Sequence, residues 1–247
     1  MITLSKVEEC PLKGLMSKSR SVKHKKPTGE LGSLRVGSGS AIYSTHKQPE
    51  LKNEIEKRVL DLALCAARSK GDDLYNLTNP PIQNPENDFD FTLLTQNGTE
   101  YLDLMEVALF QGKGRYEDTP TSYNIGKMVQ KVLEGIQKKS KQYGRPSSPV
   151  HLLLYSTDWR FYLRSNVLDL LASRVARHKH VFSSIKYVYP DSQGGSVLEH
   201  VFPRSADSFS TYDENTAART LVVFGDIRKA QVQLDGTAII PMQNPLS

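Results

Sequence analysis

Three acidic residues on a predicted β-hairpin are the first candidates for chemistry in this chain. Asp88 and Asp90 stand where one apolar run, Phe89–Leu94, begins, and Glu106 stands inside the next run, Tyr101–Phe110. Burying an acid among apolar residues of a strand is costly unless a positive charge accompanies it. A divalent cation is one such charge, and Mg²⁺ prefers oxygen ligands. The pattern is therefore compatible with a divalent-cation site on the hairpin.

The turn of this hairpin is predicted at Asn97-Gly98, because Asn-Gly supplies the positive φ angles of a tight turn. Asp90 lies seven residues before Asn97, and Glu106 lies eight residues after Gly98. We therefore expect the two carboxylates to be near neighbours that share one cation. A cation held there polarises a phosphoryl oxygen and lowers the pKa of its bound water, which favours attack on a phosphodiester.

Helical periodicity predicts three helices around the hairpin, at Pro49–Lys70, Ser122–Tyr143 and Arg160–His180. The near-continuous apolar run Val150–Tyr155 is typical of a strand buried on both faces. Ile185–Tyr189 is a further predicted strand. Shorter strands are predicted at Val197–Phe202, Leu221–Phe224 and Val232–Met242, and apolar residues between Leu31 and Tyr43 allow one more.

This order of elements predicts the α/β (α+β) class, with a central mixed β-sheet flanked by helices. Residues 1–48 are expected to form a basic, Gly/Ser-rich N-terminal arm. Residues 49–190 are expected to form the core, and residues 191–247 a C-terminal β-rich extension of the same domain.

The charge balance favours an anionic partner such as nucleic acid. The 247 residues carry a net charge of +5, and the pI is near 9.0. The alternative is that the basic residues are simply solvated. The candidate phosphate contacts lie in the arm and on the third predicted helix: Lys23, Lys25, Lys26, Arg160, Arg164, Arg174 and Arg177.

Several other classes of protein fit the sequence poorly. The histidines lack zinc-ligand spacing, and the sequence has neither a recognisable nucleophile elbow nor a glycine-rich phosphate loop after a strand. The two cysteines do not suggest a disulfide scaffold. Neither a signal peptide nor an apolar run of membrane-spanning length is evident, so a cytoplasmic protein without membrane contact is expected.

The acids and the order of elements resemble the restriction-endonuclease-like, or PD-(D/E)xK, nuclease superfamily. That family has a core of helix, three strands, helix and strand, with an aspartate opening the second core strand and Glu-x-Lys on the third. Asp90 matches the aspartate, with Asp88 as an alternative, and Glu106 matches the glutamate. The resemblance covers roughly residues 50–158 and implies Mg²⁺- or Mn²⁺-dependent hydrolysis of phosphodiester bonds in DNA or RNA. It also implies an additional acid on the preceding helix, Glu54 or Glu56.

The sequence departs from this family at Ala108, two residues after Glu106, where the family has lysine. That lysine orients the attacking water and stabilises developing charge. Candidates to replace it are Lys113, Lys127, Gln130 and Lys131.

Two alternatives to an active nuclease remain open. One is a catalytically inactive nuclease-like domain that serves as a nucleic-acid-binding or protein-assembly module. The other is a protein without a nucleic-acid role, which forms a homodimer or binds a partner protein. Glu106 would then be a structural acid paired with an arginine such as Arg115 or Arg160.

Overall fold

The computed structural model describes residues 28–29, 31–37, 40–46, 48–85, 88–109, 122–190, 195–204, 213–223, 231–232 and 238–239. These residues contain a six-stranded mixed sheet with helices on both faces, which confirms the predicted mixed α/β class. In sheet order the strands are β3 (Ile82–Gln83), β4 (Phe91–Thr95), β5 (Gly98–Glu106), β7 (Val150–Tyr155), β8 (Phe182–Pro190) and β9 (Ser196–Phe202).

The middle of the sheet is parallel and its two sides are antiparallel. Strands β5, β7 and β8 run in parallel, whereas β3, β4 and β9 each pair antiparallel with their neighbours. All six residues of β7 are buried, as its continuous apolar run predicted. Its side chains alternate between two cores: Val150, Leu152 and Leu154 face one, and Leu153 and Tyr155 face the other.

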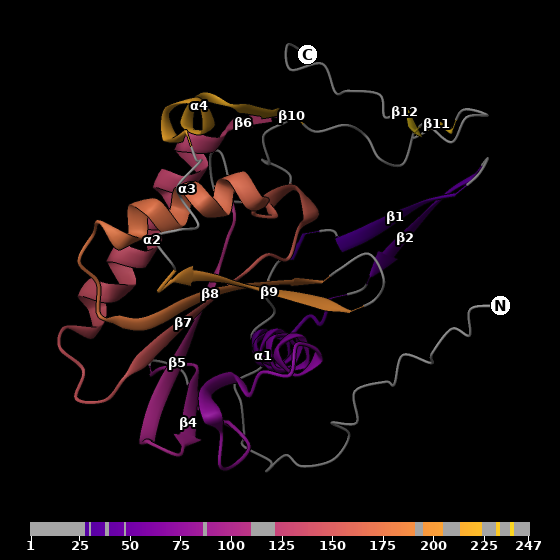
Figure 1. The fold of residues 1–247 in the computed structure, drawn as a ribbon. Coiled ribbons are helices and arrows are strands. Elements are labelled where there is room, and N and C mark those ends of the chain that lie inside the picture. Colours follow the sequence, from indigo (N-terminus) through magenta and orange to yellow (C-terminus); the bar gives the residue numbers. More distant parts are fainter. Residues whose placement is uncertain are drawn as a thin grey trace.

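Three amphipathic helices cover this sheet: α1 (Lys52–Ser69), α2 (Ile125–Tyr143) and α3 (Ser165–Ala176). Figure 1 shows α1 against one face and α2 with α3 against the other. Helix α1 ends at Ser69, and Gly71 follows two residues later with a φ of 72°, which glycine adopts readily. Helix α2 begins later than predicted, because residues 122–124 form a short strand. The side chain of Asn124 then caps α2 by accepting a hydrogen bond from the Lys127 amide at 3.1 Å.

The prediction of one helix from Arg160 to His180 is wrong at both ends. The chain forms a 3₁₀ turn, η3 (Trp159–Phe161), then an extended passage, and enters α3 only at residue 165. Phe161 and Leu163 are both buried, which is the two-residue period of extended backbone. The Leu163 amide donates to the Tyr187 hydroxyl at 3.1 Å, so this donor is satisfied without a helix.

The segments outside the main sheet add small elements. β1 (Leu31–Gly37) and β2 (Ser40–His46) form an antiparallel hairpin where the sequence predicted an irregular arm with one possible strand. A C-terminal helix that the sequence did not predict, α4 (Glu214–Arg219), follows the main sheet. The other elements are η1 (Leu74–Asn76), β6 (Ser122–Asn124), β10 (Leu221–Val223), β11 (Gln231–Val232) and β12 (Ala238–Ile239).

Three of these minor strands correspond to sequence predictions. Strands β10, β11 and β12 overlap the predicted C-terminal runs, and β10 pairs with β6. Strand β9 belongs to the main sheet, beside β8. Among the residues that the structure describes, there is no helix long and apolar enough to cross a bilayer.

Candidate functional site

The turn between β4 and β5 lies at Gln96-Asn97, one residue earlier than predicted. Thr95 pairs with Gly98, whose φ of 115° is readily adopted only by glycine. The Thr95 hydroxyl lies across the turn: it accepts the Asn97 amide at 3.1 Å, and its oxygen lies 3.1 Å from the Gly98 carbonyl oxygen. A different turn changes which residues of the two strands face each other, and here each partner moves by two positions. The predicted pairing of acids therefore changes.

Asp90 faces Asp103 and not the predicted glutamate. Phe91 pairs with Leu102, so the next position along the ladder brings Asp90 beside Asp103. The two carboxyl groups interact, since Asp103 is among the causes that raise the pKa of Asp90. In addition, Asp90 Oδ2 accepts the Leu104 amide at 2.7 Å. The hairpin thus brings the two acids together at the start of β4.

Helix α2 supplies the partners of Asp103 from across the core. Lys139 Nζ and the Tyr143 hydroxyl each lie 2.5 Å from Asp103 Oδ2. Asp103 is only 2% exposed, so its charge depends on these donors and on Asp90. The Phe89 ring packs on Tyr143 at a centroid distance of 4.5 Å and covers this end of the site.

Burial and the neighbouring acids shift the pKa of Asp90. The pKa of Asp90 is raised to about 8, first by burial and then by its hydrogen bond with Asp103 and by the charges of Asp103 and Glu56. The Leu104 amide opposes this shift. The pKa of Tyr143 is also raised, by burial and by Asp103. Without a cation, Asp90 therefore retains a proton at neutral pH.

Glu106 points to the opposite face of β5 from Asp103, because the two positions differ by three along the strand. Thr157 lies just after β7, and its hydroxyl donates a short hydrogen bond to Glu106. Arg160, one of the arginines that the sequence offered as a partner for Glu106, pairs instead with Asp158. Asp90 and Glu106 are thus held by different partners on different sides of the strand.

Tyr155 is affected by acids on both faces of β5. Burial raises the pKa of Tyr155, and the charges of Glu106, Glu56, Asp90 and Asp103 raise it further, in that order. In the described part of the chain, however, no three acidic, histidine or cysteine side chains converge tightly enough to hold a metal ion. The acids that contact each other directly are Asp90 and Asp103.

Known proteins offer no guide to this site: no family model, no curated sequence and no solved structure matches the chain. Its chemistry follows from the donor set. Two adjacent carboxyl groups suit Mg²⁺ or Mn²⁺, since Mg²⁺ commonly uses one or two carboxylates together with waters and substrate phosphates. A lysine beside them adds a positive charge for a phosphate.

The other acids that the sequence offered as metal ligands differ in their exposure to solvent. Glu56 is buried on α1, where it accepts Gln83 Nε2 at 3.0 Å and pairs with Lys52 at 3.3 Å. Glu54, the predicted metal ligand on the same helix, is exposed. Asp88 is exposed as well, and its carboxylate accepts the Phe89 amide at 2.8 Å.

The predicted substitutes for the missing lysine do not reach the acids. Lys127 is exposed in the first turn of α2, about 18 Å along the helix axis from Lys139 at 1.5 Å per residue. Gln130 and Lys131 are also exposed, and Lys113 lies outside the described residues. The sequence held one signal for Lys139, since its i+4 neighbour Tyr143 shares its helix face.

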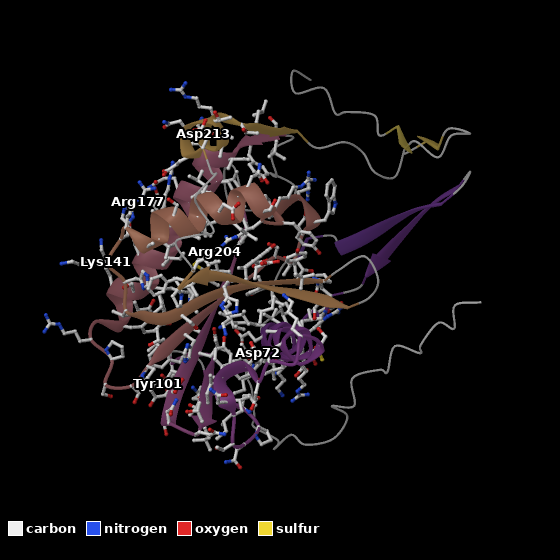
Figure 2. The ribbon with its side chains drawn as sticks, viewed as in Figure 1. Asp72, Tyr101, Lys141, Arg177, Arg204 and Asp213 are labelled. Atoms are coloured by element: carbon white, nitrogen blue, oxygen red, sulfur yellow. The ribbon has the colours of Figure 1, made fainter. Side chains whose placement is uncertain are left out.

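Structural ion pairs hold most of the described arginines that the sequence proposed as phosphate contacts. Arg160 binds buried Asp158 through two bonds of 2.8 Å. Arg177 contacts Glu214 on α4, and Arg174 Nε lies 3.6 Å from the same carboxylate. Figure 2 shows Arg177 on the side of the molecule where α3 and α4 lie.

Arg164 is exposed where α3 begins. The three lysines proposed in the arm, Lys23, Lys25 and Lys26, lie outside the described residues.

Proposed function

We propose that this chain is a metal-dependent nuclease of the restriction-endonuclease-like type, which hydrolyses phosphodiester bonds in DNA or RNA at Asp90 and Asp103. The observation that carries this proposal is the contact between these two acids at the base of the hairpin, with Lys139 bound to the second. Asp103 thus takes the role that the sequence alone gave to Glu106.

The order and direction of the elements support this proposal. From α1 the chain passes through β3, β4 and β5, then α2, then β7, which is the order of helix, three strands, helix and strand that the resemblance implies. The four strands are neighbours in that same order within the sheet. α2 connects the parallel strands β5 and β7, as a crossover helix does.

Asp90 and Asp103 would hold the divalent cation, Mg²⁺ or Mn²⁺. Their oxygen donors suit a hard cation, and a bound cation would compensate the charge of buried Asp103 and half-buried Asp90. When bound, the cation supplies Lewis-acid polarisation of a phosphoryl oxygen and a more acidic bound water.

Lys139 provides the amine that the strand itself lacks. Ala108 lies beyond the end of β5, and Met105, two residues after Asp103, occupies the other position where a motif lysine would be expected. The Lys139 ammonium is oriented by its contact with Asp103 at 2.5 Å. From that position it stabilises negative charge that develops on a phosphoryl group, or holds the attacking water.

The test is cleavage of DNA and RNA, single- and double-stranded, by the purified full chain with Mg²⁺ or Mn²⁺. Asp90→Asn and Asp103→Asn should abolish cleavage, and Lys139→Met should slow it by about 10²-fold or more. Glu106→Gln is the matched control, because this acid lies on the same strand but on its other face, and it should retain most of the activity. Titration calorimetry with Mn²⁺ should show binding that Asp103→Asn removes. Wild-type protein that leaves every substrate intact and binds no Mn²⁺ would refute the proposal.

A second candidate is an inactive nuclease-like module that binds nucleic acid or a protein without cleaving it. The absence of an amine at both Ala108 and Met105 favours this alternative. Such a module would bind nucleic acid in a salt-sensitive manner that EDTA does not alter. Metal-dependent cleavage that requires Asp103 would exclude it.

A further inference from the structure

Three polar side chains on adjacent strands form a hydrogen-bonded series on the α1 face of the sheet. Ser184 Oγ on β8 lies 2.8 Å from His151 Nδ1 on β7, and His151 Nε2 lies 2.6 Å from Glu100 Oε2 on β5. Thr95 on β4 donates to the second oxygen of Glu100 at 3.1 Å. The series faces away from Asp103, since Glu100 and Asp103 point to opposite sides of β5.

The contacts at the two ring nitrogens of His151 determine which nitrogen carries the hydrogen. Glu100 Oε2 can only accept when it is ionised, so Nε2 carries the hydrogen. Nδ1 then has a free lone pair and accepts the hydroxyl proton of Ser184. Burial lowers the pKa of His151, although Glu100 opposes this shift, so the imidazole is held in its neutral form. The arrangement is that of a nucleophile, a base and an acid that orients the base.

The series is unusual for the interior of a sheet. Ser184 and His151 are each 9% exposed and Glu100 is 8% exposed, although apolar residues surround them on the same face. Burying a carboxylate and a histidine costs free energy that apolar residues at these positions would avoid. Because every member is satisfied by another, the chain retains a complete polar network where packing alone requires none.

A strained tyrosine covers this network. Tyr75, in η1, packs its ring on His151 at a centroid distance of 4.8 Å. Its φ of 67° lies in the left-handed region, which is unfavourable for a bulky residue. Its hydroxyl is buried and finds no hydrogen-bond partner among the described residues. Lys186 Nζ lies over the Tyr75 ring, 4.9 Å from its centre. Strained backbone and an unsatisfied polar group in the cover both reduce the free energy that its opening costs.

We propose that Ser184, His151 and Glu100 form a second reactive site, at which Ser184 is acylated by small carboxylic esters when the Tyr75 segment opens. Ser184 Oγ forms a bond to the ester carbonyl carbon while its proton passes to His151 Nδ1. The ester C–O bond then breaks, and the alcohol leaves with that proton. Water attacks the acyl-serine in the second half, with His151 again the base, and releases the carboxylic acid and free Ser184. Glu100 holds the imidazole in its orientation and stabilises its charged form.

The test uses diisopropyl fluorophosphate on the full chain, because this small probe bonds its phosphorus to an activated serine and releases fluoride. Peptide mapping by mass spectrometry should find one adduct, on Ser184. Tyr75→Gly removes the cover and suits the left-handed backbone, so it should accelerate labelling by about tenfold or more. Glu100→Gln and His151→Gln should each slow labelling, the latter by about 10²-fold or more.

Ser140→Ala is the matched control, because Ser140 is also 9% exposed but hydrogen-bonds the Val181 amide and has no histidine partner among the described contacts. This variant should be labelled at the wild-type rate. Hydrolysis of 4-nitrophenyl acetate, followed by its released nitrophenol, should show the same order of variants. The proposal is overturned if neither wild-type protein at saturating probe nor a folded Tyr75→Gly protein carries an adduct on Ser184. Equal labelling of wild-type and His151→Gln protein would overturn it as well.

Discussion

Lys139 on α2 holds its ammonium nitrogen 2.5 Å from the carboxylate of Asp103 on β5, thirty-six residues earlier in the chain. Asp103 is 2% exposed, and its other partner from α2, Tyr143, is neutral. The helix therefore contributes the positive charge that compensates this buried acid. The same contact ties the position of α2 to the candidate site.

Lys139→Met should destabilise the metal-free protein by about 3–5 kcal/mol, because it leaves Asp103 buried beside Asp90 without a positive charge. Mg²⁺ should restore part of this loss, since the cation replaces the missing charge. Urea unfolding in EDTA and in Mg²⁺ measures both effects. Lys138→Met is the control, because Lys138 is exposed and its removal should change stability by less than about 0.5 kcal/mol. Equal stability of the two variants in EDTA would contradict this prediction.

The Asp90–Asp103 pair should make stability depend on pH in metal-free buffer. The pKa of Asp90 rises from an ordinary 3.8 to about 8 on folding. The stabilisation from the bound proton is therefore complete below about pH 4 and is lost as the pH rises toward 8. The free energy of unfolding should fall across this window by an amount on the order of a few kcal/mol, and Asp90→Asn should flatten the fall. Denaturant titrations at several pH values in EDTA measure the slope, and an equal slope in both proteins would count against the pairing.

Glu214 should limit the binding of nucleic acid by the α3 surface. Its carboxylate engages both Arg174 and Arg177, and although burial acts to raise its pKa, the two arginines lower that pKa overall. Glu214→Gln removes the competing charge, so binding of a DNA duplex at low salt should tighten several-fold. The slope of log K against log salt should steepen by about 0.9 for each additional phosphate that the surface neutralises. Fluorescence anisotropy measures both the affinity and its salt dependence. Glu134→Gln is the control, because Glu134 is an exposed acid on α2. Unchanged affinity of the Glu214→Gln protein would show that the α3 surface binds no phosphate.

The sequence predicted the elements of this fold better than their contacts. Strand β7 and helices α1 and α2 were predictable because an apolar run or stripe is a local signal. The register of β4 and β5 was not predictable in the same way. The turn lies one residue earlier than predicted, and this shift places Asp103, and not Glu106, beside Asp90.

The contacts that give the candidate sites their chemistry join residues far apart in the chain. Lys139 meets Asp103 across 36 positions, and His151 meets Glu100 across 51. The third helix shows a further limit. Its apolar residues continue the helical period through Leu163, but the hydroxyl of Tyr187, on a strand 24 positions away, takes the Leu163 amide. Only tertiary packing decides such competition between local propensity and a distant partner.

Two glycines of α2 should respond differently to the same substitution. A Cβ at Gly126 would lie 2.7 Å from the backbone oxygen of Ala218 in α4, which cannot yield without a shift of that helix. A Cβ at Gly135 would lie 2.9 Å from Met105 Sδ, the end of a flexible side chain. Gly126→Ala should therefore lower the free energy of unfolding by about 1–3 kcal/mol. Gly135→Ala should be near neutral, because the gain of up to about 1 kcal/mol in helix propensity offsets the repacking of Met105. Thermal unfolding of the two variants measures the contrast, and a larger loss for Gly135→Ala would show that Met105 is held rigidly against α2.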